Sequence, residues 1–219
     1  ICKIKNPLLL LIILLVAVCA VTFIYLMCGS QAAPLVCERL VHPLDQLVPH
    51  HFEGSWALVA GSLNHSPSME ALRRRDSITM YFSNSSEAST LSYTQINRFG
   101  DQCQYLRYNI SAEGSTFTFD VQSRFSLSMY FLHTSCPDCV VMRWLVKSSR
   151  RISTDLYLLS RRREVEQKEL EEFRAQLKCY QLPEPVVMDS TKALCPEQPE
   201  NQPTAAAAPQ AEETVAQKA

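Results

Sequence analysis

Cys136 and Cys139 are the residues of this chain whose types and spacing most directly suggest chemistry. A Cys-x-x-Cys pair can act as a redox dithiol or supply half of a zinc site. The chain contains no second such pair, and this one lies between two predicted strands rather than at a helix N-terminus that would activate a thiol. We therefore expect a structural disulfide and no metal site, with a redox pair as the alternative.

The remaining polar motifs do not form a catalytic constellation. His50-His51 has no Cys, Asp or Glu at ligand spacing, so we expect a solvated pair. The basic runs Arg73-Arg74-Arg75 and Arg161-Arg162-Arg163 are each followed by an acid. We interpret them as solvated charges, predict no enzyme activity and expect no cofactor.

The N-terminus is built for membrane insertion. Lys3 and Lys5 precede an almost unbroken apolar run from Pro7 to Met27, and Ser30-Gln31-Ala32 offers small residues for cleavage. We expect a signal peptide over residues 1–32, with an uncleaved anchor as the alternative. The rest of the chain is then extracellular and secreted.

Cysteine content, sequons and charge agree with export. Three of the nine cysteines lie in the leader, which leaves an even number for disulfides. Sequons at Asn64, Asn84 and Asn109 predict N-glycosylation. The net charge of −1, or −3 without the two leader lysines, does not favour nucleic-acid binding.

Short segments of strand composition follow one another at roughly ten-residue spacing, which is typical of an all-β domain. We predict eight antiparallel strands that form an up-and-down barrel. They span residues 53–62, 77–83, 89–97, 102–110, 115–121, 125–133, 139–146 and 153–161.

Alternation within these strands predicts which side chains face a common interior. If Trp56 points inward, Leu58 and Ala60 share its side, and Leu91 and Leu159 face inward in the same way. Such a lining would hold a hydrophobic ligand by removing its apolar surface from water. The predicted ligand-binding residues are Leu58, Ile78, Met80, Phe82, Tyr93, Phe117, Phe119, Leu127, Met129, Phe131, Met142, Trp144 and Tyr157.

A helical pattern follows the strands. Leu170, Phe173, Leu177 and Tyr180 recur at helical spacing up to Pro183, which predicts one C-terminal helix packed outside the barrel over residues 166–180. A short strand is expected at 185–188. We assign the folded domain to residues 33–195 and a disordered tail, rich in Pro, Ala and Gln, to 196–219.

Gly54-Ser55-Trp56 resembles the first motif of the lipocalins, a family of extracellular barrels that carry small hydrophobic molecules. Arg161 lies where that family has an arginine packed over the tryptophan. Asp101-Gln102-Cys103 and Leu170-Glu171-Glu172-Phe173 resemble the branch that contains alpha-1-acid glycoprotein and apolipoprotein M. The similarity covers about residues 35–197.

The resemblance implies structural roles for particular residues. Trp56 and Arg161 would stack at the closed end of the barrel. Disulfides would join Cys37 to Cys179 and Cys103 to Cys195, while the Cys136–Cys139 pair is similar to fish members that bind saxitoxin and tetrodotoxin. The same pair replaces the second lipocalin motif, so the chain departs from the family pattern there.

These features predict a secreted, monomeric carrier of a small hydrophobic or amphipathic ligand such as a lipid, steroid, drug-like molecule or toxin. One alternative is a lipoprotein-associated carrier of sphingosine 1-phosphate that keeps its leader, for which Arg107 and Arg124 are the nearest phosphate-binding candidates. A lipid-isomerising enzyme would need a free barrel thiol. An immunoglobulin domain is a further alternative, but that fold has a tyrosine two residues before its second cysteine, where this chain has Asp101.

Overall fold

The computed structural model describes residues 7–44, 49–84, 90–113, 115–119, 125–148 and 152–197. The chain divides into two compact units, Ile1–Val41 and His42–Ala219. The described residues of the first contain one helix, α1 (Pro7–Leu40), in which leucines and valines such as Leu14 and Val16 are exposed. Among the described residues, none of the helices combines the length and hydropathy required of a bilayer-spanning segment.

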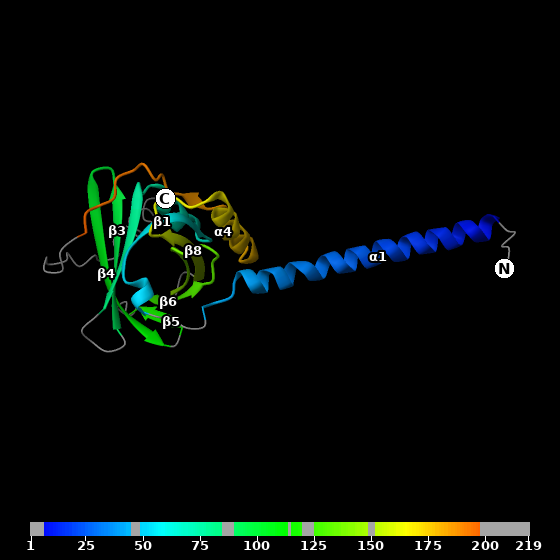
Figure 1. Cartoon of the computed structure of the whole chain (residues 1–219), viewed down its shortest axis with the longest axis horizontal. Coiled ribbons are helices and arrows are strands. Elements are labelled where there is room, and N and C mark those ends of the chain that lie inside the picture. The colour runs from blue at the N-terminus through cyan, green and yellow to red at the C-terminus, as the bar shows by residue number, and fades with distance from the viewer. Residues whose placement is uncertain are drawn as a thin grey trace, which may run out of the picture. The chain divides into compact units, whose positions relative to one another are not determined.

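The second unit is an antiparallel barrel (Figure 1). Sequential strands pair with one another from β2 to β8, and β1 pairs with both β8 and β2, which closes the sheet. The eight predicted strands are therefore confirmed, with ends that differ by at most three residues. Their bounds are β1 Gly54–Leu63, β2 Ser77–Asn84, β3 Thr90–Phe99, β4 Gln102–Glu113, β5 Thr116–Phe119, β6 Phe125–Leu132, β7 Cys139–Ser148 and β8 Ile152–Ser160.

The predicted C-terminal helix is α4 (Gln167–Cys179), which lies against the outside of the barrel (Figure 1). A reciprocal capping box between Glu166 and Glu169 starts it. Phe173 and Leu177 are buried against an outer cluster from β1, β6, β7 and β8. The chain then forms β9 (Val186–Val187), which adds a short strand to β1.

Two short helices were not predicted from the sequence: α2 (Pro49–Phe52) and α3 (Ser66–Arg73). The segment Ser66-Pro67-Ser68 reads as a turn, and eight residues are too few to establish a helical period. In α3, Pro67 occupies the first turn, where a missing N–H costs nothing. Met69 and Leu72 are buried, so tertiary packing stabilises this helix.

The inward placement expected for Ala60 is wrong because β1 contains a β-bulge. Leu58 pairs with Leu159, but the next paired residue is Ala60, opposite Leu158. The extra residue, Val59, shifts the alternation of the strand by one position. Val59 and Ala60 consequently both belong to the outer cluster under α4.

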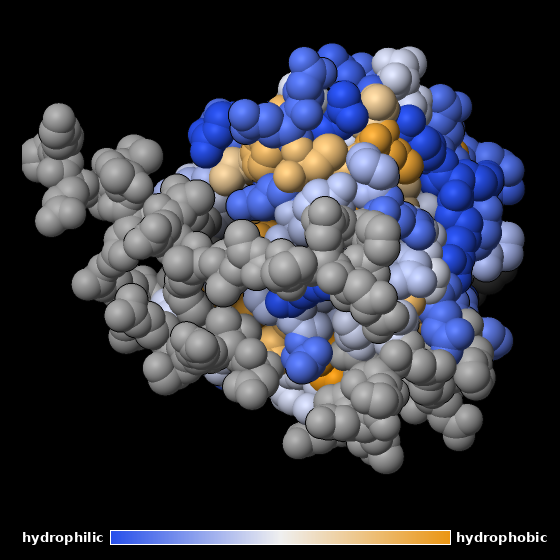
Figure 2. All heavy atoms as spheres, turned by 90° about the vertical axis from the view of Figure 1, so that its left-hand side faces the viewer, coloured by the Kyte–Doolittle hydropathy of each residue, from blue (hydrophilic) through white to orange (hydrophobic). Residues whose placement is uncertain are grey.

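Burial divides the barrel into an apolar interior and a mixed surface. On the face shown in Figure 2, hydrophobic residues lie in small patches among polar ones. The largest fully buried side chains include Tyr93, Phe82, Phe131 and Met129, all on strands of the barrel. The candidate functional site is therefore the interior of the barrel.

Candidate functional site

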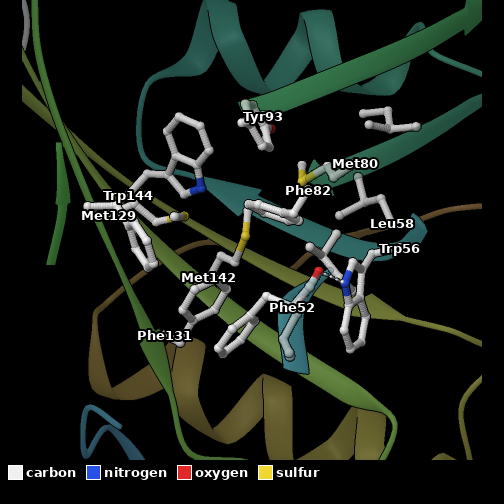
Figure 3. Packing of buried hydrophobic residues seen from close by; sticks show 14 of the residues in the cluster. Phe52, Trp56, Leu58, Met80, Phe82, Tyr93, Met129, Phe131, Met142 and Trp144 are labelled. Atoms are coloured by element: carbon white, nitrogen blue, oxygen red, sulfur yellow. Dashed lines mark hydrogen bonds between the residues drawn. The ribbon is translucent and has the colours of Figure 1, made fainter. Parts of the chain in front are cut away.

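All thirteen side chains predicted to bind a ligand belong to one interior cluster. Figure 3 shows part of this cluster, including Met80, Phe82 and Trp144. Eleven of them are buried, and Leu127 and Tyr157 are partly buried and packed against the others. Direct cross-strand pairs such as Met129 with Trp144 and Met142 with Tyr157 bring them together. Side chains from seven of the strands thus form one continuous apolar interior. Leu159 joins this cluster, whereas the side chain of Leu91 lies outside the described residues.

Aromatic rings dominate the middle of the cluster. The ring of Tyr93 lies 5.1 Å from Phe82, 5.6 Å from Phe119 and 5.8 Å from Trp144, measured between centroids. The rings of Phe119 and Trp144 are 4.7 Å apart. Tilted and edge-on arrangements at these distances are favourable, so the aromatic residues hold one another in place.

A row of polar groups continues from Tyr93 along the inner face of β3. The Tyr93 hydroxyl donates to Gln95 Oε1 at 3.1 Å, and Gln95 Nε2 donates to Asn97 Oδ1 at 2.8 Å. Burial raises the pKa of Tyr93 well above its usual range, and the neighbouring Tyr157 and Tyr108 add to the rise. The hydroxyl therefore stays a neutral donor. The interior carries hydrogen-bonding groups on one wall as well as apolar surface.

Trp56 closes one end of the interior, as the resemblance implied. Its indole is 4% exposed, and its Nε1 donates to the carbonyl oxygen of Phe52 at 2.8 Å. The Arg161 guanidinium lies 4.0 Å from the centre of the indole. Arg161 also donates to the carbonyl oxygens of Ser55 and Glu53. Partial burial lowers the pKa of Arg161.

Gly54 is required at this closed end for two reasons. Its φ of +93° lies in the left-handed region that favours glycine. A Cβ atom at this position would also lie only 2.9 Å from Nη1 of Arg161. The packing of Arg161 against the Gly-x-Trp motif therefore depends on the absence of a side chain at position 54.

The opposite end of β1 leads directly into α3, which packs against the interior cluster. Met69 and Leu72 of α3 belong to that cluster. A Cβ atom at Gly61 would lie 2.9 Å from Cδ1 of Tyr157 and 3.1 Å from Cδ2 of Leu72, so the missing side chain permits this close approach. Beside α3, a depression of about 500 Å³ is lined by residues that include Arg73 and Pro183.

The Cys136-x-x-Cys139 pair forms a disulfide in the turn between β6 and β7. Both cysteines are buried, and the Glu169 carboxylate lies within 4.8 Å of their sulfur atoms. Arg162 bonds both Asp138 and Glu169, so the nearby carboxylates already have a cation. Because the sulfur atoms are bonded to each other, this arrangement suits a structural bridge better than a metal site.

The other disulfide described in full joins Cys103 of β4 to Cys195 in the segment after β9. The segment that contains Cys195 also accepts hydrogen bonds from Ser77 and Tyr105. All five cysteines of the barrel unit are disulfide-bonded, while Cys19 is free in α1. The bridge between Cys37 and Cys179 stays a prediction.

The remaining predicted site residues lie outside the cluster. Tyr108 of β4 packs into the interior, so alternation places Arg107 on the other face of that strand and removes it as an interior phosphate ligand. Arg124 lies outside the described residues. Of the sequons, Asn64 and Asn109 are exposed, and the side chain of Asn84 is outside the description.

Several interior residues were not predicted from the sequence. Phe52 precedes the first strand, yet its ring stacks on Phe131 with 4.1 Å between centroids. Ile110 and Tyr108 lie on the inner face of β4, where the apolar alternation is interrupted by Gln104. Strand parity applied to β4 would have found them, whereas nothing local marks Phe52, Met69 or Leu72 as interior.

Comparisons with known proteins show the fold. The chain is similar to the solved structure of lipocalin 12 from rat epididymis, with 18% identity and a TM-score of 0.62 over 70% of this chain and 91% of that one. It is also similar to the siderocalin Ex-FABP, with 16% identity and a TM-score of 0.56 over 68% and 96% of the two chains. Neither a family model nor a curated protein matched the sequence. The barrel unit therefore has the lipocalin fold.

Proposed function

We propose that this protein binds and transports a small hydrophobic or amphipathic molecule inside its barrel and does not transform it. The observation that carries the proposal is the convergence of the thirteen inward side chains on one interior cluster within a lipocalin fold. The siderocalin neighbour is described as acting through dual ligand specificities, which agrees with a binding role for such an interior.

The composition of the cluster suits ligands of varied shape. Met80, Met129 and Met142 all lie in it, and thioether side chains repack at low cost. Each square ångström of apolar ligand surface removed from water contributes about 25 cal/mol. A ligand enters by displacing contacts among these methionines and the surrounding rings, so binding and repacking of the interior are coupled.

Entry at the end opposite Trp56 is the route the packing favours. The Trp56 end is closed by Arg161 and by carbonyl hydrogen bonds, whereas at the other end the described residues include one eight-residue helix, α3, packed on the cluster. Only three residues of α3 are buried: Ser68, Met69 and Leu72. Displacing α3 therefore disrupts fewer contacts than opening the other end.

We further propose that the barrel is secreted and acts as a monomer. Support for secretion comes from the apolar leader, the exposed sequons at Asn64 and Asn109 and the disulfide bonding of every barrel cysteine. The same bonding argues against a thiol-dependent isomerase. The alternative of sphingosine 1-phosphate transport gains no support from Arg107, which lies on the outer face of β4.

A charge placed on the inner face tests the proposal. Met129 is fully buried in the interior, and its neighbour Ser128 faces the other side of β6. The wild-type protein should bind one fluorescent hydrophobic probe, Met129→Arg should abolish binding, and Ser128→Arg should leave it nearly unchanged. Met129→Gln, which is close in volume, provides a second variant if the arginine prevents folding.

Probe binding that survives both Met129 substitutions in folded protein would exclude the interior as the binding site. Circular dichroism and a cooperative thermal transition establish that each variant is folded.

A further inference from the structure

The indole N–H of Trp144 is a buried donor inside the barrel. Trp144 is 9% exposed, and its ring contacts Phe119, Tyr93 and Tyr157. Figure 3 shows the indole extending from β7 into the cluster. Within the part of the chain that the structure describes, Nε1 of Trp144 has no hydrogen-bond partner.

Two other polar groups of the same interior have hydrogen-bond partners in the protein. The indole N–H of Trp56 donates to the carbonyl of Phe52, and the hydroxyl of Tyr93 donates to Gln95. Leaving a buried donor unsatisfied costs about 1–3 kcal/mol, and native proteins contain few such groups. The contrast between the two tryptophans marks Trp144 as a position where a partner from outside the chain is expected.

We propose that Trp144 Nε1 donates a hydrogen bond to an uncharged oxygen, a carbonyl or hydroxyl, of an otherwise apolar ligand. This inference rests on the proposed function and adds the chemical class of the ligand. An indole N–H can only donate, so the ligand atom must be an acceptor. The surrounding aromatic rings contact the apolar part of the same molecule.

Asp155 indicates why the oxygen should be uncharged. It is the cross-strand partner of Trp144 on the inner face and is 4% exposed. A ligand carboxylate beside it would place two acidic groups at one site, where each disfavours ionisation of the other. A ketone, ester or alcohol avoids that cost.

A comparison that changes both the ligand and the Trp144 side chain tests the hydrogen bond. Methyl octyl ketone, decane and decanoic acid compete with a fluorescent hydrophobic probe for the wild-type protein and for Trp144→Phe, which keeps a ring and removes the N–H. Because the ligands differ in their solubility in water, the measured quantity is the change in the ketone-to-decane affinity ratio. We expect Trp144→Phe to lower that ratio by about 2- to 12-fold, the range for one hydrogen bond.

Ser128→Ala, on the outer face of β6, is the control, since it changes a side chain outside the lining, and it should leave the ratio unchanged. An equal ratio in wild-type and Trp144→Phe proteins overturns the inference, as does a larger effect on decanoic acid than on the ketone. Failure of decane and ketone alike to displace the probe from any variant would instead contradict the proposed function.

The indole resonances provide a test that needs no substitution. The chain has two tryptophans, so a ¹H–¹⁵N spectrum should show two indole signals. Methyl octyl ketone should shift the Trp144 signal downfield and decane should not, while the Trp56 signal, already bonded to Phe52, stays in place. Identical responses of Trp144 to both ligands overturn the proposal.

Discussion

Replacing Trp56 by alanine removes the side chain that closes one end of the barrel. An aromatic side chain buries about 150–250 Å², which at about 25 cal/mol per Å² corresponds to roughly 4–6 kcal/mol. Observed losses for such substitutions are about 3–5 kcal/mol, because the cavity partly collapses. The hydrogen bond to Phe52 adds about 1 kcal/mol. We therefore expect the free energy of unfolding to fall by about 4–6 kcal/mol.

The stacking of Trp56 on Arg161 can be measured separately. At 4.0 Å from the ring centre and partly desolvated, the guanidinium should contribute about 1–2 kcal/mol. Urea unfolding of Trp56→Leu, Arg161→Met and the double variant forms a cycle that isolates this term. Arg174→Met removes an exposed ion pair to Glu184 and serves as the control, with an expected change below about 0.5 kcal/mol.

A coupling energy near zero between Trp56 and Arg161, with both single variants folded, would refute the cation–π contact. A Trp56→Ala melting temperature equal to that of the wild type would refute the burial of the ring itself.

Three further predictions concern the same barrel. Gly54→Ala should lower the free energy of unfolding in urea by about 1–3 kcal/mol, because alanine is strained at φ +93° and its Cβ meets Arg161; an unchanged midpoint argues against that backbone. Replacing Cys103 and Cys195 together by serine should cost about 4–5 kcal/mol in a thermal melt, since their bond spans 92 residues. Burial raises the pKa of Tyr93, so above about pH 10 the unfolded chain loses this proton while the folded protein keeps it. The contribution of Tyr93 to stability should be constant below that pH and be lost as pH rises from there through the raised pKa, so stability should fall less steeply in Tyr93→Phe than in the wild type.

The barrel could be predicted because a strand is recognised from the local pattern of its own residues. In β6, Leu127, Met129 and Phe131 alternate with polar or amphipathic residues, and this pattern alone determines which face is buried. The Trp56 and Arg161 contact was predictable only through resemblance, since nothing in the composition links residues 105 positions apart.

Other features could not be predicted because tertiary contacts decide them. The bulged residue is Val59 itself, which is neither glycine nor proline, so strict alternation placed Ala60 on the wrong face. Leu72 becomes interior only because α3 packs over the barrel beside Gly61. Among the described residues the N–H of Trp144 has no partner, and this depends on the surrounding groups, on which a sequence pattern carries no information.

Intermolecular nuclear Overhauser effects between a bound ligand and ¹³C-labelled methionine methyl groups test the central claim most directly. With methyl octyl ketone bound, we predict contacts to Met80, Met129 and Met142, which lie in the interior cluster on three different strands. A bound ligand that gives no contact to any of these three methyl groups would contradict a carrier with an interior site.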